Sequence, residues 1–375
     1  MKLYLIAGEA SGDSRGAELM RSLRLRSPDL EFFGAGGREM RAFAGGHMHD
    51  WADEAVMGLW DVLKKYGYFK AQFDRMLADI EQVAPAALIL IDYPGFNLRL
   101  AKAVKRRLPK VRIIYYISPQ VWAWNRGRIP KMAGFLDLML CIFPFEKPLY
   151  EASGLRTVFV GHPLLDSLET RRISADREPD LVGLFPGSRE KEVRKIFPVM
   201  VAAAARMRSR RPELRFEAAA ASPMMADRMR EILAASGHDP AFCKVQTGGS
   251  HELMQRAAAG MVCSGTATLE SAYFGMPLCI LYKVAWLTWI IAKRVVQVAY
   301  VGMPNVLANR EIAREFLQSD ATPDAVATEM LRLVTDPAAS AAMRSELSAV
   351  IAGLGERGAA DRAAHAILEA LETSA

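Results

Sequence analysis

The chain has 375 residues, a length typical of two domains, and its 51% hydrophobic and 24% charged composition excludes an intrinsically disordered protein. The formal net charge of +6 favours anionic partners only weakly. Four scattered cysteines without a C-x-x-C spacing exclude a zinc knuckle and a disulfide framework, which fits a reducing compartment. No apolar run reaches the about 18 residues of a membrane-spanning helix.

Short apolar runs alternate with amphipathic segments, which predicts an α/β fold with parallel sheets. The first run, LYLIA, is too short for a signal peptide and predicts a strand. Two series of strands are expected, at 2–7, 31–34, 86–92, 111–117, 137–143 and 156–160, and then at 181–185, 214–219, 259–263 and 277–282. Helices are expected at 12–25, 67–83, 96–107, 189–209, 265–274 and 323–334.

The two series predict two Rossmann-like domains, at 1–168 and 178–345, joined by the polar segment 166–180. The Ala-rich tail, 346–375, predicts helices, and whether they pack back on the first domain stays open. In open parallel sheets, ligands bind outside the carboxyl ends of the strands. The turns that follow the predicted strands are therefore the places to look for chemistry.

The turn GEASGD follows the first strand, and its glycines allow a tight turn and a close backbone approach. Its polar side chains either cap the next helix or contact a sugar and its hydroxyls; they belong to Glu9, Ser11 and Asp13, beside Gly8.

Asp92 ends the apolar strand ALILID and precedes YPGFN, which contains Asn97. A carboxylate at this place is expected to face an interdomain cleft and to be partly desolvated, which raises its basicity and suits a general base. The alternative is a capping role for the helix that follows.

The stretch ISPQVWAWNRGR combines aromatic rings with cations just after the fourth strand. It lies in the span 93–136, which contains ten basic residues and no acidic one. The rings either pack in a core or meet a lipid–water boundary, where cations contact phosphate. The candidates are Gln120, Trp122, Trp124, Arg126 and Arg128. The apolar run VAWLTWIIA, 284–292, is a second candidate contact with lipid.

The histidines carry less information. His162, in FVGHPLLD, is interpreted as a hinge or cleft-lining residue rather than a catalytic one. His47 and His49 alternate without a third ligand nearby, and we expect no metal site.

Two turns in the second half predict a diphosphate site. The turn FPGSR presents backbone amides at Gly187 and Ser188 and a guanidinium at Arg189. The run SGTATLE places small and hydroxyl residues at a helix N-terminus, namely Ser264, Gly265, Thr266, Ala267 and Thr268. Glu270 follows one turn later, where its carboxylate can accept hydrogen bonds from a ribose. The sequence has no D-x-D pair, which disfavours a metal-bridged diphosphate.

These motifs resemble the lipid-A-disaccharide synthase family in content and order, over about residues 3–320. The motifs are GEASGD, GAGG, VMGLWDVL, IDYPGFN, YYISPQVWAW, FPFEK, FVGHPLLD, FPGSR, SGTATLE, YK and MPN. Family members often have a second acid where Gly95 stands here, which leaves Asp92 as the candidate base.

The resemblance implies a GT-B fold, with two Rossmann-like domains whose parallel sheets face a cleft. It implies an inverting transfer of 2,3-diacylglucosamine from UDP to 2,3-diacylglucosamine 1-phosphate at the cytoplasmic face of the inner membrane in Gram-negative cells. Asp92, Arg189 and Glu9 are the expected catalytic residues, and Asn305 is expected to line the UDP-sugar site. Neither a cofactor nor nucleic acid is expected, and a homo-oligomer stays open. A UDP-sugar 2-epimerase and a peptidoglycan-type N-acetylglucosaminyltransferase are the alternatives.

Overall fold

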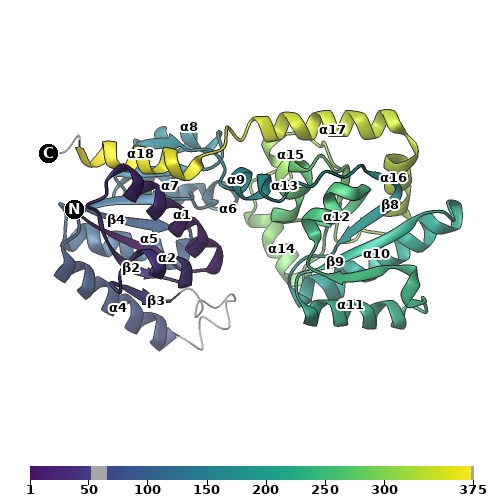
Figure 1. Ribbon diagram of the computed structural model, residues 1–375, viewed down its shortest axis with the longest axis horizontal. Coiled ribbons are helices and arrows are strands. Elements are labelled where there is room, and N and C mark those ends of the chain that lie inside the picture. Colours follow the sequence, from purple (N-terminus) through teal and green to yellow (C-terminus); the bar gives the residue numbers. More distant parts are fainter. Residues whose placement is uncertain (52–65, 373–375) are drawn as a thin grey trace. The chain divides into compact units, whose positions relative to one another are not determined.

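The computed structural model describes residues 1–51 and 66–372, which form two compact units (Figure 1). The first unit contains Met1–Pro163 and Leu354–Ala375, and the second contains Leu164–Gly353. The motif VMGLWDVL lies outside the described residues. The chain therefore enters the second unit once and returns to the first for its last helix.

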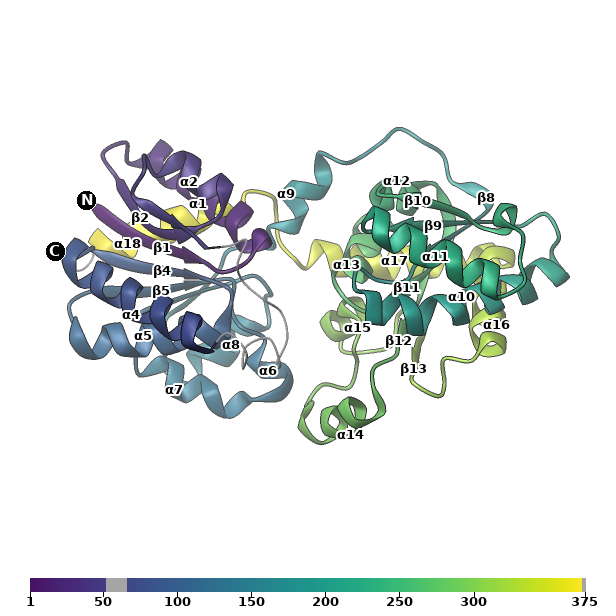
Figure 2. The ribbon, with the colours of Figure 1, turned by 90° about the horizontal axis from the view of Figure 1, so that it is seen from below.

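A seven-stranded parallel sheet forms the centre of the first unit, in the order β3-β2-β1-β4-β5-β6-β7. Part of this order can be followed in Figure 2 from β2 through β1 and β4 to β5. The strands β1, β4 and β5 are buried along nearly their whole length, which explains their apolar sequences. The strands are β1 (Lys2–Ala7), β2 (Glu31–Gly36), β3 (Met48–Asp50), β4 (Ala87–Ile91), β5 (Arg112–Tyr116), β6 (Leu138–Cys141) and β7 (Thr157–Phe159).

Helices follow most of these strands, as a doubly wound sheet requires. The last one, α18, lies beside α1 (Figure 1), where Asp361 accepts hydrogen bonds from Arg26 at 2.6 and 2.9 Å. Its buried side includes Ala363, Ala364 and Ile367. The helices are α1 (Ala10–Arg26), α2 (Arg38–Phe43), α4 (Tyr66–Val83), α5 (Pro94–Arg107), α6 (Val121–Trp124), η1 (Arg126–Arg128), α7 (Ile129–Ala133), α8 (Glu146–Glu151) and α18 (Ala359–Glu372).

The second unit repeats this plan with a six-stranded parallel sheet in the order β10-β9-β8-β11-β12-β13. Its strands are β8 (Glu178–Phe185), β9 (Arg215–Ala220), β10 (Lys244–Thr247), β11 (Ala257–Cys263), β12 (Leu278–Tyr282) and β13 (Glu315–Leu317). Its helices are α9 (Leu164–Glu169), α10 (Glu190–Arg210), α11 (Pro223–Ala235), η2 (Pro240–Phe242), α12 (Ser250–Arg256), α13 (Thr266–Tyr273), α14 (Trp286–Val295), α15 (Met303–Ala308), α16 (Pro323–Thr335) and α17 (Pro337–Ala352).

The predicted α/β fold with two parallel sheets is confirmed. Three short strands were not predicted, namely β3, β10 and β13, which all lie at sheet edges. Edge strands of three or four residues need no long apolar run, so the sequence carries little signal for them. Within the described ranges, no helix combines the length and apolarity that crossing a bilayer would demand.

Candidate functional site

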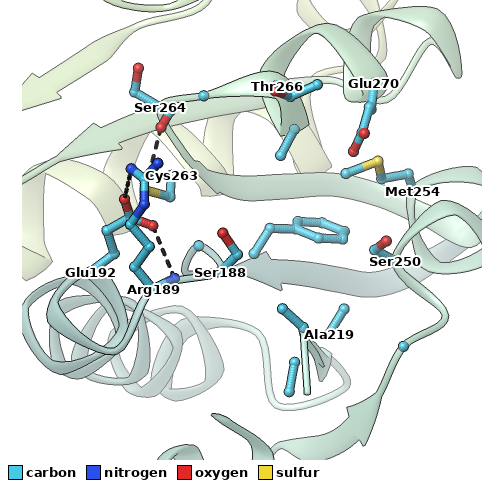
Figure 3. A pocket seen from close by; sticks show the side chains of 17 residues that line it. Ser188, Arg189, Glu192, Ala219, Ser250, Met254, Cys263, Ser264, Thr266 and Glu270 are labelled. Carbon is cyan, nitrogen blue, oxygen red and sulfur yellow. Dashed lines mark hydrogen bonds and ion pairs between the residues drawn. The ribbon is translucent and has the colours of Figure 1, made fainter. Parts of the chain in front are cut away.

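A pocket of about 440 Å3 lies at the carboxyl ends of the strands of the second sheet (Figure 3). Its walls come from the ends of β8, β9 and β11 and from the helices that follow β10 and β11. The residues that line it are Phe185, Gly187, Ser188, Arg189, Glu192, Ala219, Ala220, Ala221, Gly248, Ser250, Met254, Cys263, Ser264, Gly265, Thr266, Ala267 and Glu270. The two turns predicted to bind diphosphate therefore meet in one pocket.

Both turns depend on glycines with positive φ. Gly187 has φ of +105°, and a Cβ atom there would overlap the Glu192 carboxylate. Gly265 has φ of +149° and precedes the first residue of α13. Because the first amides of a helix have no partner within it, the start of α13 offers N–H groups and a partial positive charge to an anion.

Arg189 lies at the mouth of this pocket with 65% of its side chain exposed. Its Nη1 atom donates to Glu192 Oε1 at 3.1 Å, and its backbone N–H donates to Glu192 Oε2 at 3.3 Å. Glu192 thereby caps α10 and orients the guanidinium at the same time (Figure 3). The planar guanidinium is permanently charged and has a fork of N–H donors that matches the geometry of a phosphate.

Glu270 lies on α13 with its side chain 20% exposed, and His251 Nε2 lies 3.6 Å from its Oε2 atom. The turn that contributes Gly248 and Ser250 to the pocket was not predicted from the sequence, because 244–247 was not predicted as a strand. The signal that would have found it is TGGS, a glycine turn between a strand and a helix.

Arg177 fastens the far ends of the two helices that line this pocket. Its Nη1 atom donates to the carbonyl oxygens of Met254 and Ala257, at 2.8 and 2.6 Å, and Nη2 donates to that of Phe274. These carbonyls end α12 and α13, where the helix dipole favours a cation. Burial lowers the pKa of Arg177 to about 10, so the guanidinium stays charged at neutral pH.

Two residues expected in the UDP-sugar site have structural roles instead. Asn305 is fully buried: its Nδ2 atom donates to Ala313 O and Glu315 Oε1, and its Oδ1 atom accepts from the amides of Ile312 and Ala313. Thr268 is also fully buried, and its hydroxyl donates to Gly265 O. With these hydrogen bonds made and no exposed surface, neither side chain can reach a ligand.

Asp92 follows β4, as predicted, at the carboxyl edge of the first sheet. Burial, with a smaller contribution from the negative charge of Glu9, raises its pKa from 3.8 to about 6. Asp92 and Tyr93 both have a left-handed backbone, with φ of 46° and 49°. The Asp92 carbonyl accepts from Tyr115 Oη at 2.5 Å and from Asn97 Nδ2 at 2.7 Å, which holds this unusual conformation in place.

Those contacts correct the expected role of Asn97, which is fully buried and braces Asp92 rather than facing an acceptor. Asp13 is corrected as well: it is 5% exposed, and its carboxylate accepts from the amides of Gly37, Glu39 and Met40. Asp13 therefore caps α2, a helix distant in sequence, and not the helix that directly follows this turn. Gly8 is packed against the Tyr93 ring, whereas Ser11 is exposed.

The stretch after β5 divides into an inward and an outward half. Trp122 is 3% exposed, and its Nε1 atom donates to Glu146 Oε1 at 2.8 Å, so the expectation that it faces lipid is wrong. Trp124 is 41% exposed and lies under the Arg128 guanidinium, 5.0 Å from it. Gln120 and Arg126 are exposed too. The aromatic–cationic surface is therefore formed by Trp124 and the arginines.

The sequence matches a family model described as lipid-A-disaccharide synthetase over residues 3–369. A protein named lipid-A-disaccharide synthase from Trichlorobacter lovleyi is 40% identical over 381 aligned positions, which cover 100% of this chain and 98% of the relative. The chain belongs to the lipid-A-disaccharide synthase family.

The same architecture occurs in solved structures with low sequence identity. A UDP-GlcNAc 2-epimerase from Neisseria meningitidis bound to UDP-GlcNAc is 10% identical, with a TM-score of 0.64 and full coverage of both chains. A ugt transferase from Siraitia grosvenorii in complex with UDP is also 10% identical, with a TM-score of 0.59 and 99% coverage of each chain. At such identity the likeness concerns the fold, which is GT-B.

In this family member, acids from outside the basic span 93–136 neutralise part of it. Lys105 donates to Asp137 at 2.8 Å, and Arg112 lies 3.6 Å from the same carboxylate. Arg107 donates to Glu81 at 2.9 Å. The span 93–136 contains no acidic residue, but acidic residues from other segments lie next to some of its cations.

His162 packs its ring against Phe143 at 5.2 Å, and its backbone N–H donates to Leu354 O at 3.2 Å. Burial, with a smaller effect of Arg15, lowers the pKa of its imidazole to about 4. The ring is therefore neutral at physiological pH. The hydrogen bond from the His162 backbone to Leu354 O joins the two segments at which the chain leaves and re-enters the first unit.

Proposed function

We propose that this enzyme transfers 2,3-diacylglucosamine from its UDP carrier to 2,3-diacylglucosamine 1-phosphate, giving the β-1,6 disaccharide 1-phosphate and UDP. Family membership and the GT-B fold support the reaction class. The observation that carries the proposal is the pocket of the second unit, where two amide turns and an arginine converge.

The diphosphate of the donor is expected to bind at this convergence. The amides of Gly187, Ser188 and residues 265–267 supply donors, and Arg189 supplies a positive charge. Glu270 lies on the same wall and is the proposed acceptor for the ribose hydroxyls. The charge that develops on departing UDP would be stabilised by these groups without a divalent ion. Retention of turnover in EDTA supports this part, and its abolition, with rescue by Mg2+, contradicts it.

Asp92 is the proposed general base for the acceptor 6-hydroxyl. Its raised pKa makes it a stronger base than an ordinary aspartate, yet it is still ionised at neutral pH. The hydroxyl oxygen then attacks the anomeric carbon while the bond to UDP breaks, so configuration inverts in one displacement. Burial raises the basicity of Asp92, the charge of Glu9 adds a smaller contribution, and Glu9 is the second candidate base.

We further propose that Trp124, Arg126 and Arg128 meet the lipid–water boundary from which an acylated acceptor comes. An aromatic ring suits the headgroup level, and the arginines suit phosphate on a lipid or on an anionic inner-membrane surface. Trp286, 75% exposed on α14, is a second candidate contact with lipid. Alanine substitutions at these positions should weaken flotation with anionic vesicles; unaltered binding would contradict the proposal.

The deciding experiment incubates the enzyme with UDP-2,3-diacylglucosamine, with and without the 1-phosphate acceptor, and follows UDP and disaccharide. Acceptor-dependent formation of both products supports the proposal. UDP release or a 2-epimer without acceptor favours the epimerase alternative, and equal turnover of unacylated acceptors favours a peptidoglycan-type transferase.

Asp92→Asn should lower kcat by about 10²–10⁴-fold while UDP still binds. Asp74→Asn is a matched control, because Asp74 is an exposed carboxylate of the same unit that pairs with Lys70.

A further inference from the structure

Glu146 is a fully buried carboxylate that the proposed reaction does not use. It begins α8 and lies in the motif FPFEK. Its Oε1 atom accepts from Trp122 Nε1 at 2.8 Å, and its Oε2 atom accepts from the Phe143 amide at 3.1 Å. One carboxylate therefore joins the turn after β6 to the short helix α6 after β5.

A second contact from the same helix reaches the same turn. Tyr150 lies one helical turn after Glu146, and its hydroxyl donates to Pro119 O at 2.8 Å. The Trp122 ring also packs edge-on against Phe145 at 4.8 Å. Helix α8 thus holds the segment 118–122 at both of its ends, from inside the first unit.

The outward half of this stretch depends on the inward half. The Trp122 carbonyl accepts from Arg126 Nε at 3.1 Å, and Arg128 lies over the Trp124 ring. Trp122 therefore links the aromatic–cationic surface to Glu146.

The buried surroundings of Glu146 make the charged form of its carboxylate energetically unfavourable. The titratable groups that face it are the Cys141 thiol on β6 and the Tyr150 phenol on α8, and burial raises the pKa of both. Burial likewise raises the pKa of Glu146 to about 7, although the nearby Ser118 hydroxyl and the hydrogen bonds from Trp122 and the Phe143 amide oppose this rise. A buried carboxylate that relies on hydrogen bonds stabilises a fold less than apolar packing would. Its value is therefore expected to lie in the geometry that it imposes.

We propose that Glu146 is a positioning residue for the acceptor: through Trp122 it fixes the segment 118–128, and so sets the affinity for the phosphate-bearing lipid acceptor without touching it. The inference deepens the proposed function and rests on it for the identity of the acceptor. It predicts that the acceptor KM, rather than kcat or the donor KM, responds to this buried group.

Two variants test the connection. In Glu146→Gln, a single amide oxygen remains for the two N–H groups of Trp122 and Phe143, so the hydrogen bond that holds Trp122 is weakened or lost. Trp122→Phe keeps an aromatic ring and removes the indole N–H. Each should raise the acceptor KM about tenfold, the effect of losing one hydrogen bond to a charged group, with kcat and the donor KM within about twofold. In the Trp122→Phe background, Glu146→Gln should add less than about twofold.

The matched control is Glu329→Gln, which alters another buried glutamate, 6% exposed and paired with Arg332 in the second unit. It should leave the acceptor KM unchanged. Backbone hydrogen exchange gives a readout independent of turnover: Glu146→Gln should speed exchange in 118–128 about tenfold, as expected for losing one hydrogen bond to a charged group, and leave 178–353 unaltered.

The proposal is overturned if the two substitutions multiply in their effects, if kcat falls as much as acceptor affinity, or if exchange in 118–128 is unaltered. Should Glu146→Gln fail to fold, Trp122→Phe decides alone through the acceptor KM. Failure of the wild-type enzyme to consume the acylated substrates would refute the proposed function instead, and the exchange experiment would still decide whether Glu146 fixes this segment.

Discussion

Replacing Asp92 by asparagine should make the first unit more stable while it removes activity. The folded state holds this carboxyl where burial and Glu9 raise its pKa from 3.8 to about 6. Ionising it in the folded protein is therefore unfavourable relative to the unfolded chain, by about 3 kcal/mol for this difference in pKa. Asparagine carries no charge and tolerates the left-handed backbone of this position.

The sign of the effect depends on pH in a defined way. Below pH 3.8 the carboxyl is protonated in both states, so the substitution gains nothing. Above about pH 6 the wild-type protein carries the full penalty, and the variant should be more stable by up to about 3 kcal/mol. For a unit of this size, that corresponds to a rise in Tm of roughly 6–12 °C.

Differential scanning calorimetry at pH 4, 6 and 8 measures this difference, with Asp74→Asn as the exposed control. A variant that is equally or less stable than wild type at pH 8 would refute the argument that Asp92 is desolvated. A gain that persists at pH 4 would refute the assignment to ionisation.

The other predictions concern catalysis, binding and packing. Because Asp92 must be ionised to act as a base, kcat should fall about tenfold per pH unit below pH 6, and a flat profile down to pH 5 would remove it from this role. Arg189→Ala should weaken UDP binding at least about tenfold by calorimetric titration, since a charge-assisted contact to phosphate is lost; an unaltered Kd would place the diphosphate elsewhere. Asn305→Ala should destabilise the second unit by about 2–4 kcal/mol in urea unfolding, because it leaves buried partners unpaired, yet keep the UDP Kd within about twofold when folded. Arg177→Ala should also destabilise this unit, by about 2–3 kcal/mol, with the helix carbonyls left uncapped; unaltered unfolding would show that water replaces the guanidinium.

The sequence predicted the parts of the site that depend on backbone geometry. Gly187 and Gly265 mark turns that few other residues can form, and the runs around them indicated amide donors where the structure has a pocket. Asp92 could be predicted as a candidate because a carboxylate directly after an apolar strand lies at the edge of the sheet where ligands bind.

The sequence could not show the direction in which a polar side chain points. Asp13, Asn97, Trp122 and Asn305 all follow the right kind of strand or turn, yet each is buried and hydrogen-bonded to groups that lie 5 to 24 positions away in the sequence. The same limit hid Glu146, because FPFEK gives no sign that its carboxylate reaches an indole more than twenty positions earlier. Such pairings are set by packing between neighbouring turns, which local patterns do not encode.

Helix α18 has a consequence for biosynthesis on the ribosome. The buried face of α18 covers α1, but it is translated only after the whole second unit has been made. A nascent chain therefore carries an incomplete first unit, with part of its apolar surface open to solvent, until the last two dozen residues emerge. Released chains truncated shortly before Leu354 should hold a protease-resistant second unit beside a first unit that chaperones still bind.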